Sequence, residues 1–484
     1  MNRAIRRVGT AIVALVLLLV GQLTYLQIIH ANSLANDPRN VRAALRDINH
    51  PRGPIVTADG VVVAKSDPVT DSKEFKFQRS YPLGPLYSQV VGYQSFVFGN
   101  TAVEQKYNNQ LVGRDADLQI HNLPNVFSSQ ATGQVVLTLR NDLQQIARDA
   151  LGTQRGSVVA IDAHTGGILA MYSNPTYDPN PLAGHDSKIV QAYHALLVAN
   201  PSKPDLARAF RERYPPGSTF KVVTASVALE SGAATPDTPF PQLSQLTLPQ
   251  TTNTLHNFGG ATCGGTLARS FQQSCNTTFG RLGLTLGDSF VPGMERFGIN
   301  DTPPIDLIPG AVQSIGPPTG SFAANQPLFA FAGIGQGDVT TTPLQMALIA
   351  AGIANGGVIM KPHVMKEIDD SDGNLVRRFN DSQWRTAVSP STAQAITALM
   401  VSVVQGGTGT AARISGVTVA GKTGTAQAPD GGVHAWFIGF APTATTVVAV
   451  AVIVEHGGSL GSEATGGHVA APIAAKILRA ALNQ

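Results

Sequence analysis

Ser218 and Lys221 are the first residues of this sequence whose types and spacing could perform chemistry. They lie in YPPGSTFKVVTA, residues 214 to 225, three positions apart and directly after two prolines and a glycine. In a helix, the side chains at positions i and i+3 lie one above the other, so a helix that starts at or near Ser218 would place the lysine over the serine hydroxyl. A neutral amine there can remove the hydroxyl proton and make the serine a nucleophile.

The Ser-x-x-Lys pattern alone is weak evidence, because so short a pattern often arises by chance. A serine after prolines is also a good helix N-cap, and a lysine one turn later is usually a solvated surface residue. The interpretation therefore depends on whether the rest of the chain supplies the context that such chemistry needs.

Two further short motifs follow in the same half of the chain. Ser274-Cys275-Asn276 comes 56 residues after Ser218, and Lys422-Thr423-Gly424-Thr425 comes after a predicted β run from Val417 to Ala420. Each motif is uninformative by itself. The three motifs in this order and in these contexts are a strong signal of one catalytic site.

The ordered motifs resemble those of the penicillin-binding proteins, a family of serine D,D-acyltransferases. Other stretches are similar to the monofunctional class B members: PRGPI and YPLG to the N-terminal module, and GQGDVTTTPLQMA, GGTGTAA and HAWFIGFAP to the transpeptidase domain. The positions that match the three family motifs are Ser218 and Lys221, Ser274 and Asn276, and Lys422, Thr423 and Gly424.

The resemblance implies how protons move in the site. Ser218 would be the nucleophile and Lys221 its base, and an amine with an ordinary pKa near 10.4 must then be kept neutral by burial or by a second cation such as Lys422. Ser274 would relay a proton to the leaving amine, and Asn276 would hold the amide of the substrate.

The resemblance also implies how the substrate is bound. Lys422 and Thr423 would take the terminal carboxylate of a D-Ala-D-Ala stem peptide, and Gly424 would let the substrate backbone approach the strand closely. The backbone N–H groups of Ser218 and Thr425 would form the oxyanion hole.

A peptidoglycan D,D-transpeptidase that β-lactams acylate is the function that this resemblance implies, with donor and acceptor stem peptides and the cell-wall synthesis machinery as partners. A β-lactamase, a D,D-carboxypeptidase and a non-catalytic β-lactam or wall-binding sensor are the alternatives. The Glu-x-x-Leu-Asn run of class A β-lactamases is absent between Asn276 and Lys422, where Glu295 and Asn300 have the wrong spacing. The Glu-Asp-x-x-Phe motif of bifunctional relatives is also absent.

The composition is that of a globular protein with room for two or three domains. Of the 484 residues 43% are hydrophobic and 13% are charged, and the net charge of +3 equals the contribution of Arg3, Arg6 and Arg7. The rest of the chain is electrically balanced, which argues against a nucleic-acid surface.

An uncharged run from residue 8 to residue 29 follows the three arginines. These 22 residues would span about 33 Å as a helix, enough to cross a bilayer. A cleaved signal peptide is the alternative, but no clear cleavage site follows the run. We expect residues 1–7 in the cytoplasm, an anchor over 8–29, and the remainder on the outer side of the membrane.

The two cysteines, Cys263 and Cys275, are twelve positions apart. Outside the cytoplasm they can form a disulfide, although two buried thiols are an equally good expectation. The eleven histidines show no metal-binding pattern, and the sequence predicts no metal site and no cofactor.

Two parts with different textures follow the anchor. Residues 30–133 read as a small β-rich pedestal module, with a turn at Asp59-Gly60 between two β runs. Residues 134–484 read as an α+β domain, with a strand over 135–139, a helix at 143–151, a hairpin over 156–173, strands over 433–442 and 446–456, a helix over 472–482, and helices at 221–231 and 343–355 between them. The resemblance specifies an antiparallel sheet flanked by helices, with a helical subdomain.

Overall fold

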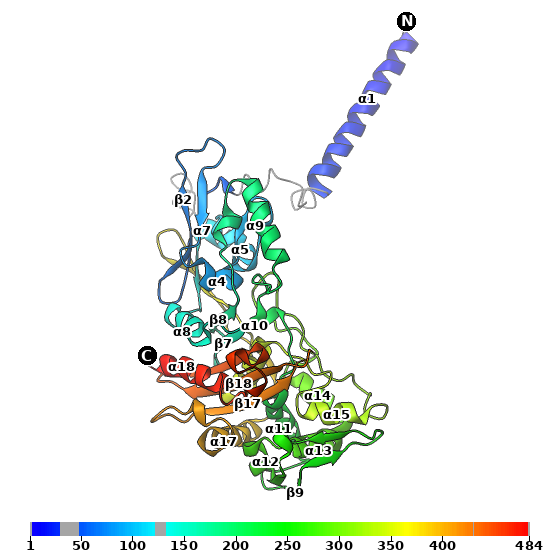
Figure 1. Cartoon of the computed structure of the whole chain (residues 1–484). Helices are drawn as coiled ribbons and strands as arrows, with labels where there is room; N and C mark the ends of the chain where they lie inside the picture. The colour runs from blue at the N-terminus through cyan, green and yellow to red at the C-terminus, as the bar shows by residue number, and fades with distance from the viewer. Residues whose placement is uncertain (1, 30–47, 122–131, 429, 483–484) are drawn as a thin grey trace.

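The computed structural model describes residues 2–29, 48–121, 132–428 and 430–482. Figure 1 shows an N-terminal helix, an upper module and a lower, larger domain arranged in this order along the molecule. The start of the predicted pedestal, residues 30–47, lies outside the described residues.

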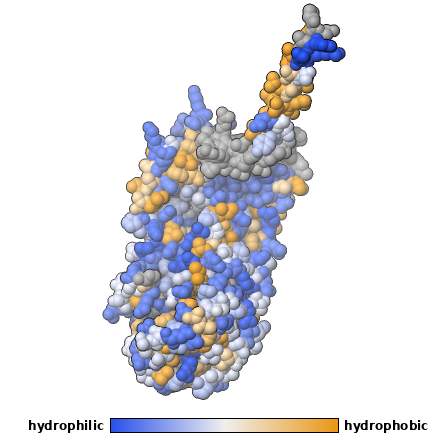
Figure 2. Space-filling model, turned by 90° about the vertical axis from the view of Figure 1, so that its right-hand side faces the viewer, coloured by the Kyte–Doolittle hydropathy of each residue, from blue (hydrophilic) through white to orange (hydrophobic). Residues whose placement is uncertain are grey.

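The N-terminal helix is α1, Asn2–Thr24, and continues into a π-helical turn, Tyr25–Ile29. Its segment Ile5–Gln27, 23 residues long, is long and apolar enough to cross a membrane, and none of it is buried against the rest of the chain. Figure 2 shows that the helix carries a hydrophobic surface with a hydrophilic tip. This surface is what a membrane anchor requires.

The upper module is built on a six-stranded sheet in the order β15-β14-β6-β1-β2-β3. The predicted turn at Asp59-Gly60 is confirmed, because β1 pairs with β2 in antiparallel fashion around it. The strands are β1 Ile55–Val56, β2 Val62–Pro68, β3 Phe77–Ser80, β6 Gln134–Leu137, β14 Met365–Asp369 and β15 Leu375–Arg378. Three of these strands follow residue 133, so the expected boundary between residues 133 and 134 runs through this sheet.

Helices complete the upper module and cover its sheet (Figure 1). They are α4 Gly84–Val91, α5 Ala102–Lys106, α6 Asn108–Leu111, α7 Ala116–His121 and α9 Ser187–Ala199. The last of them comes from the chain after residue 134, like the added strands.

The lower domain contains an antiparallel sheet in the order β17-β18-β19-β7-β8. Its strands are β7 Gly156–Asp162, β8 Ile168–Asn174, β17 Ala420–Gln427, β18 Val433–Pro442 and β19 Val447–Val454. The hairpin predicted over 156–173 and the strands predicted over 433–442 and 446–456 are confirmed. Strands from the beginning and from the end of the domain therefore pair in one sheet. The β run expected from Val417 to Ala420 is wrong, because the strand starts at Ala420 and contains the Lys-Thr-Gly motif.

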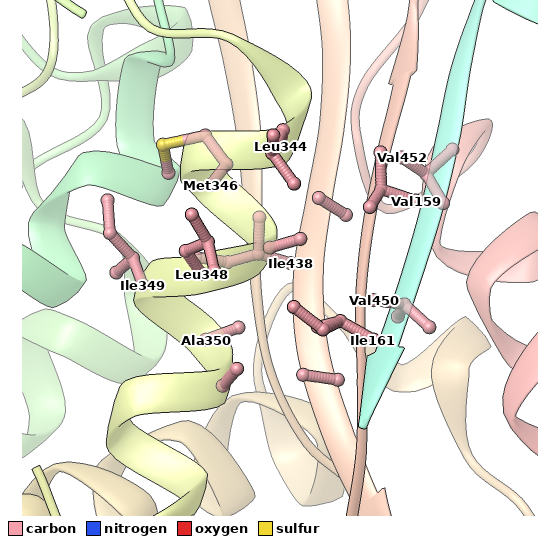
Figure 3. Packing of buried hydrophobic residues seen from close by; sticks show 14 of the residues in the cluster. Val159, Ile161, Leu344, Met346, Leu348, Ile349, Ala350, Ile438, Val450 and Val452 are labelled. Carbon is pink, nitrogen blue, oxygen red and sulfur yellow. The ribbon is translucent and has the colours of Figure 1, made fainter. Parts of the chain in front are cut away.

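Both faces of this sheet are covered, since β19 is buried from Val448 to Val454. On one face lies α16, Pro343–Ala354, which packs on β19, and Figure 3 shows its Leu348 beside Ile438 of β18. Helices α8 and α18 pack on the sheet as well, over Asn141–Leu151 and Ala470–Leu482. The helices expected at 143–151, 343–355 and 472–482 are therefore confirmed.

A helical subdomain lies below the sheet in Figure 1. Its helices are α11 Lys221–Glu230, α12 Leu267–Gln273, α13 Asn276–Leu286, α14 Phe290–Arg296, α15 Gln326–Gly333 and α17 Pro390–Gly406. Short strand pairs accompany the two main sheets: β4 Gln94–Ser95 with β5 Gly99–Asn100, β9 Pro239–Leu243 with β12 Cys263–Thr266, β10 Gln245–Thr247 with β11 Thr254–His256, and β13 Val358–Met360 with β16 Gln383–Thr386.

One buried carboxylate joins the upper module's segments. Glu104 of α5 is fully buried and accepts hydrogen bonds from Arg52 and Arg79, both at 2.6 Å, and from the Tyr81 hydroxyl at 3.2 Å. Burial alone would raise the pKa of Glu104, but the two guanidinium charges lower it below its ordinary value.

We expect Glu104→Ala to lower the free energy of unfolding by about 3 to 5 kcal/mol, because it leaves two buried guanidinium groups without their counter-charge. Urea unfolding measures this change. Asp149→Ala is the matched control, since Asp149 pairs with Arg148 on the exposed surface and its loss should leave stability nearly unchanged. Equal effects of the two substitutions would contradict the prediction.

Candidate active site

Ser218 lies in a single 3-10 turn, Gly217–Phe220, that leads directly into α11. The sequence predicts a helix from about Ser218, and the α-helix itself begins at Lys221. Ser218 is partly exposed, whereas Lys221 is fully buried. The turn therefore presents the serine to solvent and points the lysine inward.

Three contacts hold this turn. The Gly217 N–H donates to Gly335 O at 2.8 Å, the Thr219 hydroxyl donates to Pro216 O at 2.7 Å, and the Trp436 indole N–H donates to Pro215 O at 3.0 Å. Trp436 lies on the strand next to the third motif, and its indole thus ties that strand to the residues before the serine.

Glycines let the turn pack closely on strand β17. Gly217 has φ +52°, and a Cβ there would lie 2.9 Å from Ala426 Cβ and 3.0 Å from Thr425 O. A Cβ on Gly424 would lie 2.9 Å from Pro216 O. We expect a glycine at position 424 to let the substrate backbone approach the strand. The structure gives a second reason, because the missing side chain also makes room for Gly217–Phe220, which we call the nucleophile turn.

The second motif lies at a sharp turn between α12 and α13. Ser274 has φ +64° and ψ +42°, the left-handed conformation, and Asn276 is the first residue of α13. Cys275 between them is bonded to Cys263 of β12, with 5.5 Å between the two Cα atoms. The structure therefore confirms the disulfide between the two cysteines and not the pair of buried thiols.

Two buried lysines meet at the Ser274 hydroxyl. Lys221 Nζ donates to Ser274 O at 2.7 Å, to Ser274 Oγ at 3.2 Å and to Asn276 Oδ1 at 2.7 Å. Lys422 Nζ donates to the same Ser274 Oγ at 2.9 Å and to Thr423 O at 3.0 Å. Among the described residues no hydrogen bond joins Lys221 to Ser218, because the amine is turned toward the second motif.

Neither lysine has an acidic partner in the described part of the chain, since every hydrogen bond of both amines ends on a neutral oxygen. Burial lowers the pKa of Lys221 well below its ordinary value, and the charge of Lys422 lowers it further. Burial also lowers the pKa of Lys422 to about 7. An amine that is readily neutral at physiological pH can act as a base.

The predicted site residues line one cleft of about 680 Å³: Ser218, Ser274, Asn276, Thr423, Gly424 and Thr425. Lys221 and Lys422 lie beneath its surface, where they reach Ser274. Cys263 and Cys275 are buried outside the lining, behind the second motif. The Thr423 hydroxyl is held by the Thr408 hydroxyl at 2.5 Å.

Sequence reasoning misses much of the cleft wall, which includes Leu255, His256, Asn257, Phe258, Phe331, Ile334, Gln336, Gln427, Val433 and His468. Leu255 and His256 belong to β11, Phe331 to α15, Gln427 to β17 and Val433 to β18, and the others to short connecting segments. No spacing in the sequence marks these residues as neighbours. The stretch GQGDVTTTPLQMA, which contains Gln336, is recognisable only through its resemblance to the family.

Two family models match the chain. The penicillin binding protein transpeptidase domain matches residues 156–479, and the penicillin binding protein A dimerisation domain matches residues 52–136. Together the two matches cover residues 52–136 and 156–479, so that α8, Asn141–Leu151, lies between them.

Relatives match over the full length. The peptidoglycan D,D-transpeptidase PbpA of Mycolicibacterium smegmatis is 40% identical over 503 residues, which cover 100% of both chains. The protein of the same name from Mycobacterium tuberculosis is 38% identical over 508 residues, covering 100% of this chain and 99% of the relative. The ceftriaxone acyl-enzyme structure of penicillin-binding protein A from M. tuberculosis is similar with a TM-score of 0.83 and 36% identity, over 90% of this chain and 100% of that chain.

The disulfide behind the second motif gives a simple test. Thiol counting on the denatured, non-reduced protein should find no free thiol. Replacing both Cys263 and Cys275 by alanine should lower the free energy of unfolding by about 3 kcal/mol, because the bond closes a short loop in the unfolded chain. Two titratable thiols, or an unchanged stability in the double variant, would contradict the bond.

Proposed function

This chain belongs to the penicillin-binding protein transpeptidase family, and from that membership we infer that it is a class B peptidoglycan D,D-transpeptidase. It is a serine-type enzyme that cross-links stem peptides through an acyl-enzyme and is acylated by β-lactams. The observation that carries the assignment is the cleft lined by Ser218 and Ser274, where two buried lysines donate to the Ser274 hydroxyl and, in the described part of the chain, have no acidic partner.

The acylation step uses the first two motifs. Ser218 Oγ attacks the carbonyl carbon of the penultimate D-Ala while its proton passes to Lys221, whose lowered pKa favours the neutral amine. The tetrahedral intermediate then collapses, the C–N bond to the last D-Ala breaks, and Ser274 passes a proton to the leaving amine. The Ser274 hydroxyl suits this relay because it already accepts hydrogen bonds from both lysines.

The second step repeats the chemistry in reverse. The amine of an acceptor stem attacks the ester carbon, loses its proton through the same groups, and releases Ser218 as the new amide bond forms. A D,D-carboxypeptidase would differ only in that water attacks the ester instead.

Substrate binding is assigned to the strand and the nucleophile turn. Lys422 and Thr423 are proposed to take the terminal carboxylate, because an ammonium and a hydroxyl together satisfy it. Asn276 is proposed to hold the substrate amide. The backbone N–H groups of Ser218 and Thr425, both on the cleft, are proposed as the oxyanion hole.

The domain division and the topology are part of the proposal. Residues 1–7 are proposed as a cytoplasmic stub, 8–29 as a single-pass anchor, 30–133 as the non-catalytic pedestal and 134–484 as the transpeptidase domain, which also lends β6, β14, β15 and α9 to the pedestal. Arginines before the apolar segment favour a cytoplasmic N-terminus, which leaves the catalytic cleft outside the cell membrane. There it would meet its stem peptides and the cell-wall synthesis machinery.

We expect Ser218→Ala to abolish the covalent adduct with benzylpenicillin while it leaves the melting temperature nearly unchanged, since the side chain is small and partly exposed. Intact-protein mass spectrometry measures the adduct. Ser231→Ala is the control, because Ser231 ends α11 away from the cleft and should label normally. A Ser218→Ala protein that still labels would move the nucleophile elsewhere.

The lifetime of the same adduct separates a transpeptidase from a β-lactamase. An adduct that persists for an hour faces a deacylation barrier of about 22 kcal/mol, against roughly 14 kcal/mol for an enzyme that turns over about 10³ times per second. We expect the long-lived adduct on the wild-type protein. Rapid, repeated hydrolysis of the antibiotic would overturn the transpeptidase assignment.

The pH dependence of acylation tests the coupling of the lysines. The rate should rise with pH as Lys221 loses its proton. Because the charge of Lys422 lowers the pKa of Lys221, Lys422→Gln should raise that pKa and move the acid limb to higher pH, in addition to lowering the rate. The measurement is the second-order rate of acylation by benzylpenicillin against pH.

Lys476→Gln is the matched control for this titration, since Lys476 is an exposed cation on α18, outside the cleft lining. It should leave the acid limb in place. An acid limb that stays fixed in Lys422→Gln would show that the two amines do not interact electrostatically.

A further inference from the structure

Gln336 is a cleft residue to which none of the three motifs gives a role. It lies in the loop after α15 and lines the same cleft as Ser218. Its side-chain Nε2 is buried and, among the described residues, has no hydrogen-bond partner. A buried amide nitrogen without a partner is unfavourable, because it has lost its hydrogen bonds to water and gained none in the protein.

Neighbouring polar groups of the cleft have partners within the protein. Asn276 donates to His256 O at 2.9 Å and accepts from Lys221, and the His256 ring is bonded to the Thr254 hydroxyl at 2.8 Å. Thr423 is bonded to Thr408. Of the described residues that line the cleft, Gln336 is the one whose side chain has a buried polar atom without a hydrogen-bond partner.

The position of Gln336 along the cleft follows from the residue before it. Gly335 O accepts the hydrogen bond of Gly217, and Gly217 packs on Thr425 and Ala426 of β17. Lys422 lies three residues before Thr425 on that strand, which corresponds to roughly 10 Å. Gln336 thus adjoins the part of the cleft away from the proposed carboxylate site, where the N-terminal side of a bound donor peptide would run.

The chemistry of the wall favours a neutral hydrogen-bonding ligand. The described residues that line the cleft include no aspartate, glutamate, lysine or arginine, and Gln336 is accompanied by the apolar side chains of Phe331 and Ile334. A carboxamide N–H between apolar groups can donate to a peptide carbonyl. Such a carbonyl is neutral, so it loses less solvation free energy on entering the cleft than a charged acceptor would.

We propose that Gln336 is a substrate-binding residue whose carboxamide turns into the cleft and donates a hydrogen bond to a backbone carbonyl of the donor stem, N-terminal to the D-Ala that acylates Ser218. This inference rests on the proposed function. The terminal torsion of a glutamine side chain is soft, so the amide turns at little cost, and the contact gives its buried nitrogen the missing partner.

The test compares two donors on the full chain. The dipeptide D-Ala-D-Ala has no carbonyl N-terminal to the D-Ala that acylates Ser218, whereas a pentapeptide stem that ends in D-Ala-D-Ala carries such carbonyls. Gln336→Leu keeps the approximate volume but removes the hydrogen bond. We expect it to lower the efficiency of D-alanine release from the pentapeptide about tenfold, and that from the short donor less than about twofold. Its melting temperature should not fall, because the substitution also removes the unpaired amide.

Gln345→Leu is the matched control. Gln345 also has a buried amide atom without a partner, Oε1, but it lies in α16 and does not line the cleft, and its Nε2 donates to Phe297 O at 2.7 Å. This variant should lose thermal stability and keep the wild-type ratio between the two donors.

The remaining outcomes overturn the proposal in distinguishable ways. Equal losses with both donors would mean that Gln336 acts through Gly335 on the nucleophile turn and not on the stem. An unchanged ratio without any loss would mean that the residue does not contact the donor. Failure of the wild-type protein to form an acyl adduct with either peptide or with benzylpenicillin would instead overturn the proposed function, and this inference with it.

Discussion

The shared hydrogen bonding of Lys221 and Lys422 to one hydroxyl, Ser274 Oγ, is the interaction on which the rest of the site depends. Two buried ammonium groups without an acidic partner have a high free energy, because both charges are desolvated and repel each other. The pair therefore favours loss of a proton. The neutral amine that results is the base that an unactivated serine requires. The first and third motifs each bring one of these lysines to the same oxygen atom, although they lie far apart in the chain.

Close packing of backbone supplies that geometry. Gly217 and Gly424 allow the nucleophile turn to lie directly on β17, and Gly335 meets the same turn from the other side, where a Cβ would lie 2.2 Å from Gly217 O. Trp436, paired with Gly424 across the sheet, holds Pro215 through its indole N–H. The glycines thus fix the distance between the first and third motifs, and the disulfide at Cys275 anchors the second.

The chemistry-bearing residues could be predicted from the sequence because each motif is local, and the strands and helices could be predicted where hydrophobic periodicity is strong. The missing information is mostly non-local. Strands β6 and β14 join the upper sheet although they follow residue 133, since a strand's partner is chosen by edges that the fold brings together. The strand start at Ala420 was hidden because Lys422 and Thr423 are buried polar residues and break the apolar pattern. Gln336 joins the cleft only through tertiary contact.

The two parts of the molecule are joined at the segment that also borders the nucleophile turn. Asp306 of the lower domain accepts a hydrogen bond of 2.5 Å from Tyr107 of the upper module and further ones from the N–H groups of Val364 and Met365. A few residues later, Val312 donates to Phe210 O at 2.9 Å, just before the residues that lead to Ser218. The segment from Asp306 to Val312 therefore contacts both the upper module and the chain that leads to the nucleophile.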